Sequence, residues 1–355
     1  MPIPTEPIGS IPRPDELLDA VAAYQKGELA RGELDAAYAT AVRDTIEQFE
    51  RTGSPVISDG EQSKPSFATY PIDGLDNLAP DGISIPFEDG HNRQLPRLTR
   101  GPFAYKTYAG SYLKLAKQYA QRPLKQSVIA ASALSLIYPE EGIAGYPQDT
   151  FTEDLVKSAV ADIRSCLDAG AERVQIDFTE GRLAVKLDPS KQLLRRFVTL
   201  NNRVLAHFSD VERARIGIHT CPGADQDAAH SADVDYAELL PDLFQINVGN
   251  FYMTLAAEKD PEHVLAIVRE HLGAGKNVFV GVIDVNDPRV ESAEEVCERV
   301  LLAARYIPLG QLGSTDDCGF SPFGDDRSTA RKVAFDKIRA RVEGTRLAAQ
   351  KLGVA

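Results

Sequence analysis

Eight apolar runs of strand length recur along this chain, and helical patterns separate most of them. The predicted strands cover residues 7–12, 56–61, 127–136, 173–178, 215–220, 243–248, 277–284 and 310–315. The predicted helices cover residues 31–51, 152–169, 191–208, 261–272, 292–306 and 328–352. Alternating strands and helices pair in parallel through right-handed crossovers, and eight such units close into a (β/α)8 TIM barrel. We therefore expect residues 1–355 to form a single (β/α)8 barrel domain, with a doubly wound open sheet as the structural competitor.

Two segments depart from this alternating pattern. Helical runs from residue 15 onward precede the barrel and predict an antiparallel N-terminal helical extension. Residues 62–109 form a long insertion after strand 2, rich in Pro and Gly, with a hairpin-like stretch from Leu95 to Tyr105. Long loops inside compact domains commonly serve as lids or binding segments. The insertion is either a lid over the barrel rim or a peripheral decoration.

The charge balance narrows the classes of partner. The chain carries 39 Lys and Arg against 52 Asp and Glu, a formal net charge of −13. This charge opposes attraction to nucleic-acid phosphates and to anionic lipid, so we expect neither a nucleic acid nor a membrane as a partner. The sequence has no apolar run of membrane-spanning length, and its first residues lack the pattern of a secretory signal. We expect a cytoplasmic protein that acts on small molecules, in an oligomeric state that the sequence does not determine.

One imidazole and two thiols follow two of the predicted strands. His219 and Cys221 lie two residues apart at the end of the fifth strand, and Cys318 follows the eighth. Residues two apart on a strand point to the same face, so this pair can converge on one ion. Catalytic zinc typically takes three such ligands and keeps a fourth position for water or substrate. The pattern predicts a Zn2+ site at His219, Cys221 and Cys318, whereas Cys166 and Cys297 lie on apolar helical faces that indicate burial in the core.

Polar side chains also end four other predicted strands or follow them. Ser10, Glu61, Asp177 and Asn247 lie at the carboxyl ends of the first, second, fourth and sixth strands. Catalytic side chains of (β/α)8 barrels cluster at this rim, so we expect these four residues to bind substrate beside the metal. Turns after strands and the caps of helices favour the same residue types, which is the alternative interpretation.

Six short motifs, in order along nearly the whole chain, resemble those of the cobalamin-independent methionine synthase superfamily, specifically its C-terminal catalytic barrel. They are Ile8-Gly9-Ser10, Asp59-Gly60-Glu61, Ile176-Asp177, His219-Thr220-Cys221, Asp284-x-x-x-Pro288-Arg289 and Asp317-Cys318-Gly319. The length resembles the short single-barrel members, a group related to epoxyalkane:coenzyme M transferase. The resemblance implies zinc bound by the His-x-Cys pair and the late cysteine, and homocysteine held by residues matching Ser10, Glu61 and Asp177. It implies a zinc-dependent thiol alkyltransferase, with methyl transfer to homocysteine giving methionine.

Three departures from the family pattern concern the alkyl donor. Asn247 aligns with a glutamate zinc ligand, and Asn286 aligns with a histidine that protonates the folate leaving nitrogen, so Asn286 is a candidate catalytic residue. The chain has no tryptophan to stack on a pterin, and Tyr138 is the candidate substitute. Zinc with two thiolates and a neutral imidazole is less electron-rich than zinc with an added carboxylate. We therefore expect an epoxide, a sulfonium or a methylcorrinoid as the donor, with methyltetrahydrofolate as the alternative.

Two residues and two further functions remain open. Asp317, beside Cys318, is a candidate catalytic residue that orients a zinc ligand, or an ordinary turn residue. His230 follows the zinc motif closely and is expected in an exposed loop. A metal-free decarboxylase or lyase, of the type of uroporphyrinogen decarboxylase, would need cavity arginines, of which Arg182 and Arg289 are the candidates. A non-catalytic thiol- or metal-binding barrel would bind zinc without turnover.

Overall fold

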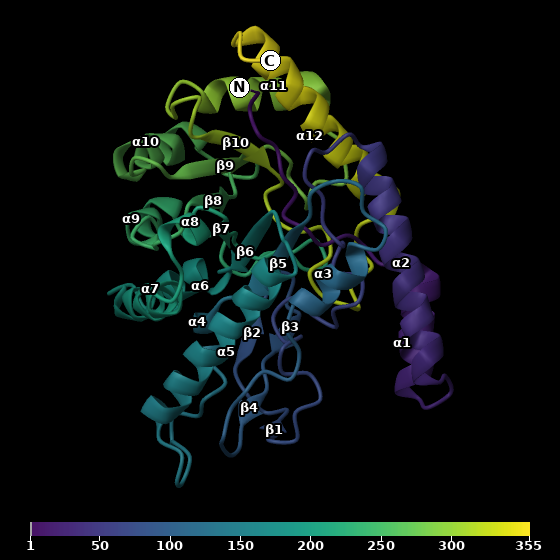
Figure 1. Cartoon of the computed structure of the whole chain (residues 1–355). Coiled ribbons are helices and arrows are strands. Elements are labelled where there is room, and N and C mark those ends of the chain that lie inside the picture. The colour runs from purple at the N-terminus through teal and green to yellow at the C-terminus, as the bar shows by residue number, and fades with distance from the viewer. Residues whose placement is uncertain (1) are drawn as a thin grey trace.

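A parallel sheet of six strands forms the centre of the protein. The computed structural model describes residues 2–355. Each strand pairs in parallel with the next, in the order β5 (Lys125–Ile129), β6 (Arg173–Asp177), β7 (Ile216–Thr220), β8 (Asn250–Met253), β9 (Asn277–Gly281) and β10 (Leu312–Thr315) (Figure 1). Nearly all residues of these strands are buried, as in parallel sheets that are covered on both faces.

Two extended N-terminal segments complete the barrel at the edges of this sheet. Thr5 forms a parallel bridge with Ser314 of β10, and Ile57 forms one with Leu124, directly before β5. Hydrogen bonds also join the two segments, from Ser58 Oγ to Gly9 O at 2.6 Å and from Ile11 N to Gly60 O at 3.0 Å. The predicted (β/α)8 TIM barrel is confirmed, with its first two strands reduced to single bridges.

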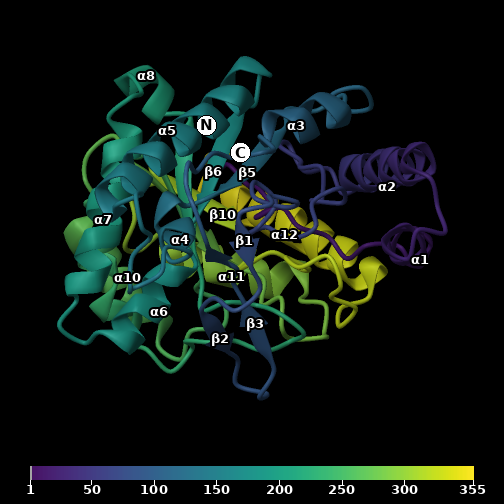
Figure 2. The same ribbon diagram turned by 90° about the horizontal axis from the view of Figure 1, so that it is seen from below.

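Helices surround the strands, and the longer ones bury an apolar face. In α7, for example, buried residues recur at three- and four-residue spacing, namely Leu194, Phe197, Val198, Asn201, Val204 and Leu205. The surrounding elements are α4 (Ala131–Ser135), α5 (Gln148–Asp168), α6 (Glu180–Leu187), α7 (Gln192–Leu205), α8 (Asp210–Arg213), η1 (Tyr236–Glu238), α9 (Leu240–Leu243), α10 (Pro261–His271), α11 (Ala293–Ala303) and α12 (Arg331–Lys351) (Figure 2). None of the helices within residues 2–355 is long and apolar enough to span a membrane.

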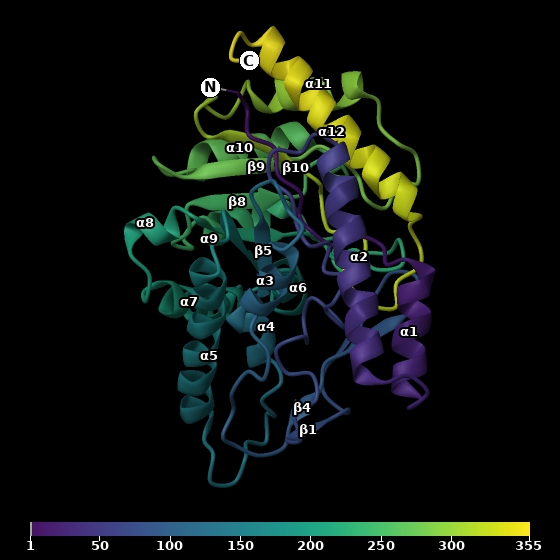
Figure 3. The ribbon, with the colours of Figure 1, turned by 45° about the vertical axis from the view of Figure 1, so that its right-hand side comes forward.

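The N-terminal helical extension stands beside the barrel. Helices α1 (Asp15–Gln25) and α2 (Arg31–Arg51) pack on each other and form a pair at one side of the molecule (Figure 3). The bounds of α2 match the predicted helix. The C-terminal half of α2 packs on the barrel through the buried residues Val42, Ile46 and Phe49. Helix α3 (Gly110–Ala116) packs against α2.

The insertion forms two small antiparallel ribbons below the sheet in Figure 1. Strand β1 (Leu78–Ala79) pairs with β4 (Arg97–Leu98), and β2 (Ser84–Pro86) pairs with β3 (Asn92–Gln94). The hairpin is therefore formed by residues 84–94. The predicted hairpin at residues 95–105 is wrong, because Arg97–Leu98 pairs instead with Leu78–Ala79.

Three predicted strands are wrong. The bridge of the first segment is at Thr5, before the predicted 7–12 strand. The 127–136 strand ends at Ile129, and α4 begins two residues later. The 243–248 strand is absent: α9 ends at Leu243, and the strand of this unit is β8, which begins at Asn250. The apolar side chains of this run, such as Ile246 and Val248, are buried without strand pairing, so burial alone produced the apolar pattern.

Candidate active site

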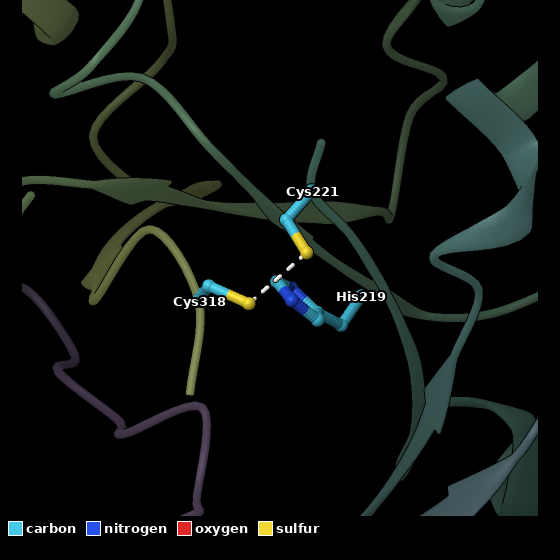
Figure 4. A group of neighbouring side chains, drawn as sticks. All are labelled: His219, Cys221 and Cys318. Atoms are coloured by element: carbon cyan, nitrogen blue, oxygen red, sulfur yellow. Dashed lines mark hydrogen bonds between the residues drawn. The ribbon is translucent and has the colours of Figure 1, made fainter. Parts of the chain in front are cut away.

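The three predicted zinc ligands meet at one end of the barrel. His219 is in β7, Cys221 directly follows that strand, and Cys318 lies in the loop after β10. Their ligand atoms lie within 4.8 Å of one another. Cys221 Sγ is 3.0 Å from Cys318 Sγ, and Figure 4 shows the imidazole directed at the same point. The carboxyl ends of two strands thus bring one nitrogen and two sulfurs together in a buried position.

The loop that carries Cys318 is fixed by its neighbour. The Asp317 carboxylate accepts the backbone N–H groups of Leu255, Ala256 and Ala257 at 2.8–2.9 Å. These three residues follow the end of β8, so the hydrogen bonds connect the loop after β8 to the loop after β10. The Cys318 backbone is thereby positioned before any ligand binds.

The electrostatics of the cluster suit a soft cation. His219 Nδ1 lies 3.3 Å from Tyr252 O, while the buried Nε2 has no hydrogen-bond partner. The hydrogen bond from the Cys318 thiol lowers the pKa of Cys221 well below its usual value. An unpartnered imidazole nitrogen beside a thiolate-forming pair is the donor set that zinc favours, so these residues fit a zinc ion.

The cluster lies in the wall of a cavity of about 1230 Å³. Ser10, Glu61 and Asp177 line the same cavity as the three ligands. Ser10 Oγ accepts the backbone N–H of Ser321 at 3.2 Å, and all three side chains are buried.

The protein's own groups only partly compensate the Glu61 and Asp177 carboxylates. Glu61 Oε1 accepts from Ser127 Oγ and lies 3.4 Å from Lys64 Nζ, whereas its Oε2 has no partner. Asp177 Oδ1 accepts from Gln175 Nε2 at 2.7 Å. Burial, with a further contribution from Glu61, raises the pKa of Asp177 to about 7. A cationic group in the cavity would therefore stabilise both carboxylates.

The family model described as the cobalamin-independent synthase catalytic domain matches residues 3–343. The chain belongs to this family. A methionine synthase of Saccharolobus solfataricus is 21% identical over 352 residues, which cover 99% of this chain and 96% of that protein. A methionine synthase of Sulfurisphaera tokodaii is also 21% identical, over 99% of this chain and 94% of its own length.

Solved structures of this synthase family share the fold. A B12-independent methionine synthase from Shewanella sp. W3-18-1, in complex with selenomethionine, superposes with a TM-score of 0.78 at 19% identity and covers 100% of both chains. A protein from Listeria monocytogenes described as a B12-independent methionine synthase gives a TM-score of 0.69 at 21% identity, over 97% of both chains.

Four residues predicted for the site lie outside the cavity of this synthase-family chain. Tyr138 donates its hydroxyl to Tyr146 O at 2.8 Å and stacks on Phe151. Asn286 is half-buried beside a shallow cleft that includes Asp225 and Phe320. The other two are Asn247 and Asp317.

Asn247 lies at the opposite end of its strand from the metal cluster. It is exposed and precedes β8, and its backbone N–H donates to Asn202 Oδ1 at 2.9 Å. The wrongly predicted strand 243–248 caused this misplacement, because the true strand begins at Asn250. Asp317 caps the exit of β8 and does not contact His219 in the hydrogen bonds described above.

Several cavity residues had no clear signal in the sequence. Lys64 lies three residues after Glu61 and donates to Ser127 O at 2.9 Å. Glu180 opens α6 and lines the cavity. His230 is 6% exposed and also lines the cavity, so the expectation of an exposed loop histidine is wrong. Charged residues after a strand look like turn or capping residues, and only the fold reveals which of them face inward.

The insertion lies at the cavity and touches the loop that follows Cys221. Phe87 of the hairpin lines the cavity and packs edge-on against His230. His91 Nε2 lies 2.9 Å from Asp225 Oδ2, four residues after Cys221. Residues 84–94 therefore cover part of the rim.

The arginines expected for a decarboxylase do not face the cavity. Arg182 is buried against Glu258 and the carbonyl of Val234. Arg289 is exposed and pairs with Glu295 at 2.9 Å. Arg13, which does line the cavity, donates to four backbone carbonyls. The other arginines that line it, Arg31, Arg93 and Arg327, each pair with an aspartate. Among the described residues, the cavity therefore has no set of free guanidinium groups of the kind that a polycarboxylate would need.

Proposed function

We propose that this protein is a zinc-dependent thiol alkyltransferase that transfers a methyl group to homocysteine. The observation that carries this proposal is the convergence of the ligand atoms of His219, Cys221 and Cys318 in the wall of a cavity that Glu61 and Asp177 also line. Membership of the cobalamin-independent synthase family supports the reaction class.

The metal cluster would activate the thiol. A free alkyl thiol with a pKa of about 8.5 is only about 3% thiolate at pH 7, and the thiolate is the nucleophile. Zinc bound by His219, Cys221 and Cys318 would supply the positive charge that lowers this pKa at a fourth, open position. All three candidate ligands are buried in the cavity wall.

The acids would hold the amino-acid end of the substrate. Glu61 Oε2 is free to accept from an ammonium group, and Asp177 lies on the neighbouring strand to His219, directly in register with it. Binding a cation between them would lower the raised pKa of Asp177 and leave both carboxylates ionised. This arrangement favours homocysteine over an anionic thiol such as coenzyme M.

The strand-six position does not supply an anionic ligand. In the register of β7 and β8, Thr220 pairs with Met253, so Thr254 follows beside Cys221. Thr254 is a neutral residue whose hydroxyl donates to Asp317 O at 3.0 Å. Thr254, and not Asn247, is therefore the neutral residue at the strand-six position. Without a carboxylate there, two thiolates and one imidazole would give a formally neutral zinc site.

The proposal is tested by metal analysis together with a methylation assay. Zinc-loaded protein should hold about one zinc per chain and should methylate L-homocysteine with methyl iodide faster than the uncatalysed reaction. Cys318→Ala should lose both properties. Cys297→Ala, which removes a buried thiol on α11, is the matched control and should keep both.

Two results would contradict the proposal. Wild-type protein without zinc above background would remove the metal centre. Bound zinc without alkylation of homocysteine, coenzyme M or another thiol would instead indicate a non-catalytic metal-binding barrel.

A further inference from the structure

We infer that Glu180 is the proton donor to the leaving group of the alkyl donor. This inference rests on the proposed function and extends it from activation of the thiol to departure of the leaving group. It assigns a role to a buried carboxyl group of the cavity that neither the sequence motifs nor the zinc cluster uses.

Glu180 is held with one oxygen bound and the other free. It opens α6, three residues after Asp177, and is 5% exposed in the cavity wall. Its Oε1 accepts from Ser132 Oγ on α4, and that hydroxyl in turn accepts from Asn201 Nδ2 on α7 at 2.7 Å. Glu180 Oε2 is buried and has no hydrogen-bond partner. The bound oxygen fixes the carboxyl group, and the other oxygen has no partner within the protein.

The surroundings keep this carboxyl group protonated at neutral pH. Burial raises the pKa of Glu180 to about 8, and the negative charge of Asp177 on β6 adds to the rise. The groups that α4 and α7 present to it are neutral, namely the Ser132 hydroxyl and the Asn201 amide. Because Ser132 donates to Oε1, the proton of the carboxyl group belongs on Oε2.

Other cavity groups are less suited to this role. Lys64 Nζ is committed to Ser127 and Glu61, and the Tyr70 hydroxyl donates to Asp162. Burial lowers the pKa of His230 to about 4, so its imidazole is neutral at pH 7 and a poor acid. Asn286, which aligns with the family's histidine acid, lies outside the cavity and cannot protonate a ligand.

The proposed step balances as a displacement. The substrate thiol releases its proton to water when it binds as thiolate. Its sulfur then forms a bond to the donor carbon while the bond from that carbon to nitrogen or oxygen breaks with its electron pair. The leaving atom takes the proton of Glu180 Oε2, and the resulting carboxylate regains a proton from water. A donor with a nitrogen or oxygen leaving group, such as methyltetrahydrofolate or an epoxide, needs this proton.

The test compares donors that do and do not need an acid. Glu180→Gln keeps an acceptor for Ser132 and removes the acidic proton. With homocysteine, transfer from 5-methyltetrahydrofolate or 1,2-epoxypropane should fall about 100-fold or more, the usual contribution of a general acid. Transfer from methyl iodide, whose iodide leaves without a proton, should stay within about two-fold, and zinc content should not change. Asp162→Asn, a buried carboxyl outside the cavity, should not discriminate between the donors.

The pH profile of the wild-type protein gives a second measurement that needs no variant. The rate with the nitrogen or oxygen donor should fall as pH rises through the pKa of Glu180, while the rate with methyl iodide should not. An equal loss with both donors in Glu180→Gln, or no loss with either, would overturn the inference. So would a wild-type protein that alkylates homocysteine only with methyl iodide or a sulfonium. Failure of the methyl iodide reaction itself would instead contradict the proposed function.

Discussion

Arg93 Nη2 donates to Asp225 Oδ1 at 2.9 Å, and the Asp225 side chain is fully buried by this contact and its neighbours. Arg93 belongs to the hairpin of the insertion, and Asp225 to the loop that follows Cys221. The same guanidinium also lies over the Phe323 ring in the loop that follows Cys318. One side chain of the insertion therefore contacts both loops that carry candidate zinc ligands, which favours the lid interpretation over a peripheral decoration.

Arg93→Ala should destabilise the protein and loosen the lid. It leaves the buried Asp225 carboxylate with His91 as its remaining side-chain partner, so the free energy of unfolding should fall by about 1 to 3 kcal/mol. Denaturant unfolding measures this loss, and limited proteolysis should show faster cleavage within residues 84–94. Arg97→Ala removes an exposed pair with Asp81 in the same insertion and should change neither. Equal effects of the two variants would contradict a specific role for Arg93.

Asp177→Asn should weaken recognition of the substrate ammonium group. Losing a hydrogen bond to a charged group removes about 1.5 to 3 kcal/mol, which corresponds to a rise of about 10- to 150-fold in the KM for homocysteine. The matched substrate is 4-mercaptobutanoate, which lacks the amino group. The wild type should prefer homocysteine, and the variant should lose most of that preference. An unchanged ratio of kcat/KM for the two thiols would remove Asp177 from substrate binding.

Asn247→Glu should leave turnover unchanged. The side chain is exposed at the amino end of β8, so a carboxylate there cannot reach the metal cluster. Steady-state rates with any active donor test this expectation. A strong change in rate would mean that the strand-six position has been misassigned.

The stability of the protein should report the protonation of Glu180. The unfolded chain loses this proton near pH 4.5, whereas burial keeps it on the folded protein until about pH 8. Between these values the folded state binds more protons than the unfolded state, so the contribution of Glu180 to stability falls as pH rises, by at most about 1.4 kcal/mol per pH unit. Glu180→Gln lacks this contribution. Its free energy of unfolding relative to the wild type should therefore rise from pH 5 to pH 8, and a constant difference would contradict the raised pKa.

The sequence predicted the barrel and the grouping of His219, Cys221 and Cys318, because both depend largely on short-range order. Residues two apart on a strand point to the same face, so the strand pattern that ends in His219-Thr220-Cys221 is enough to place both ligands together. The same logic failed at Asn247, since residues 243–248 are apolar through burial and not through strand pairing. Glu180 and His230 were missed because the inward direction of a residue in a loop or first helical turn depends on how neighbouring units pack.

The most direct test of the account is the number of sulfur ligands at zinc, measured by X-ray absorption spectroscopy before and after L-homocysteine is added. Two protein thiolates and an open position predict two sulfurs in the zinc-loaded protein and three in the complex with homocysteine. A count that stays at two would show that the thiol does not bind the metal and would contradict the proposed mechanism.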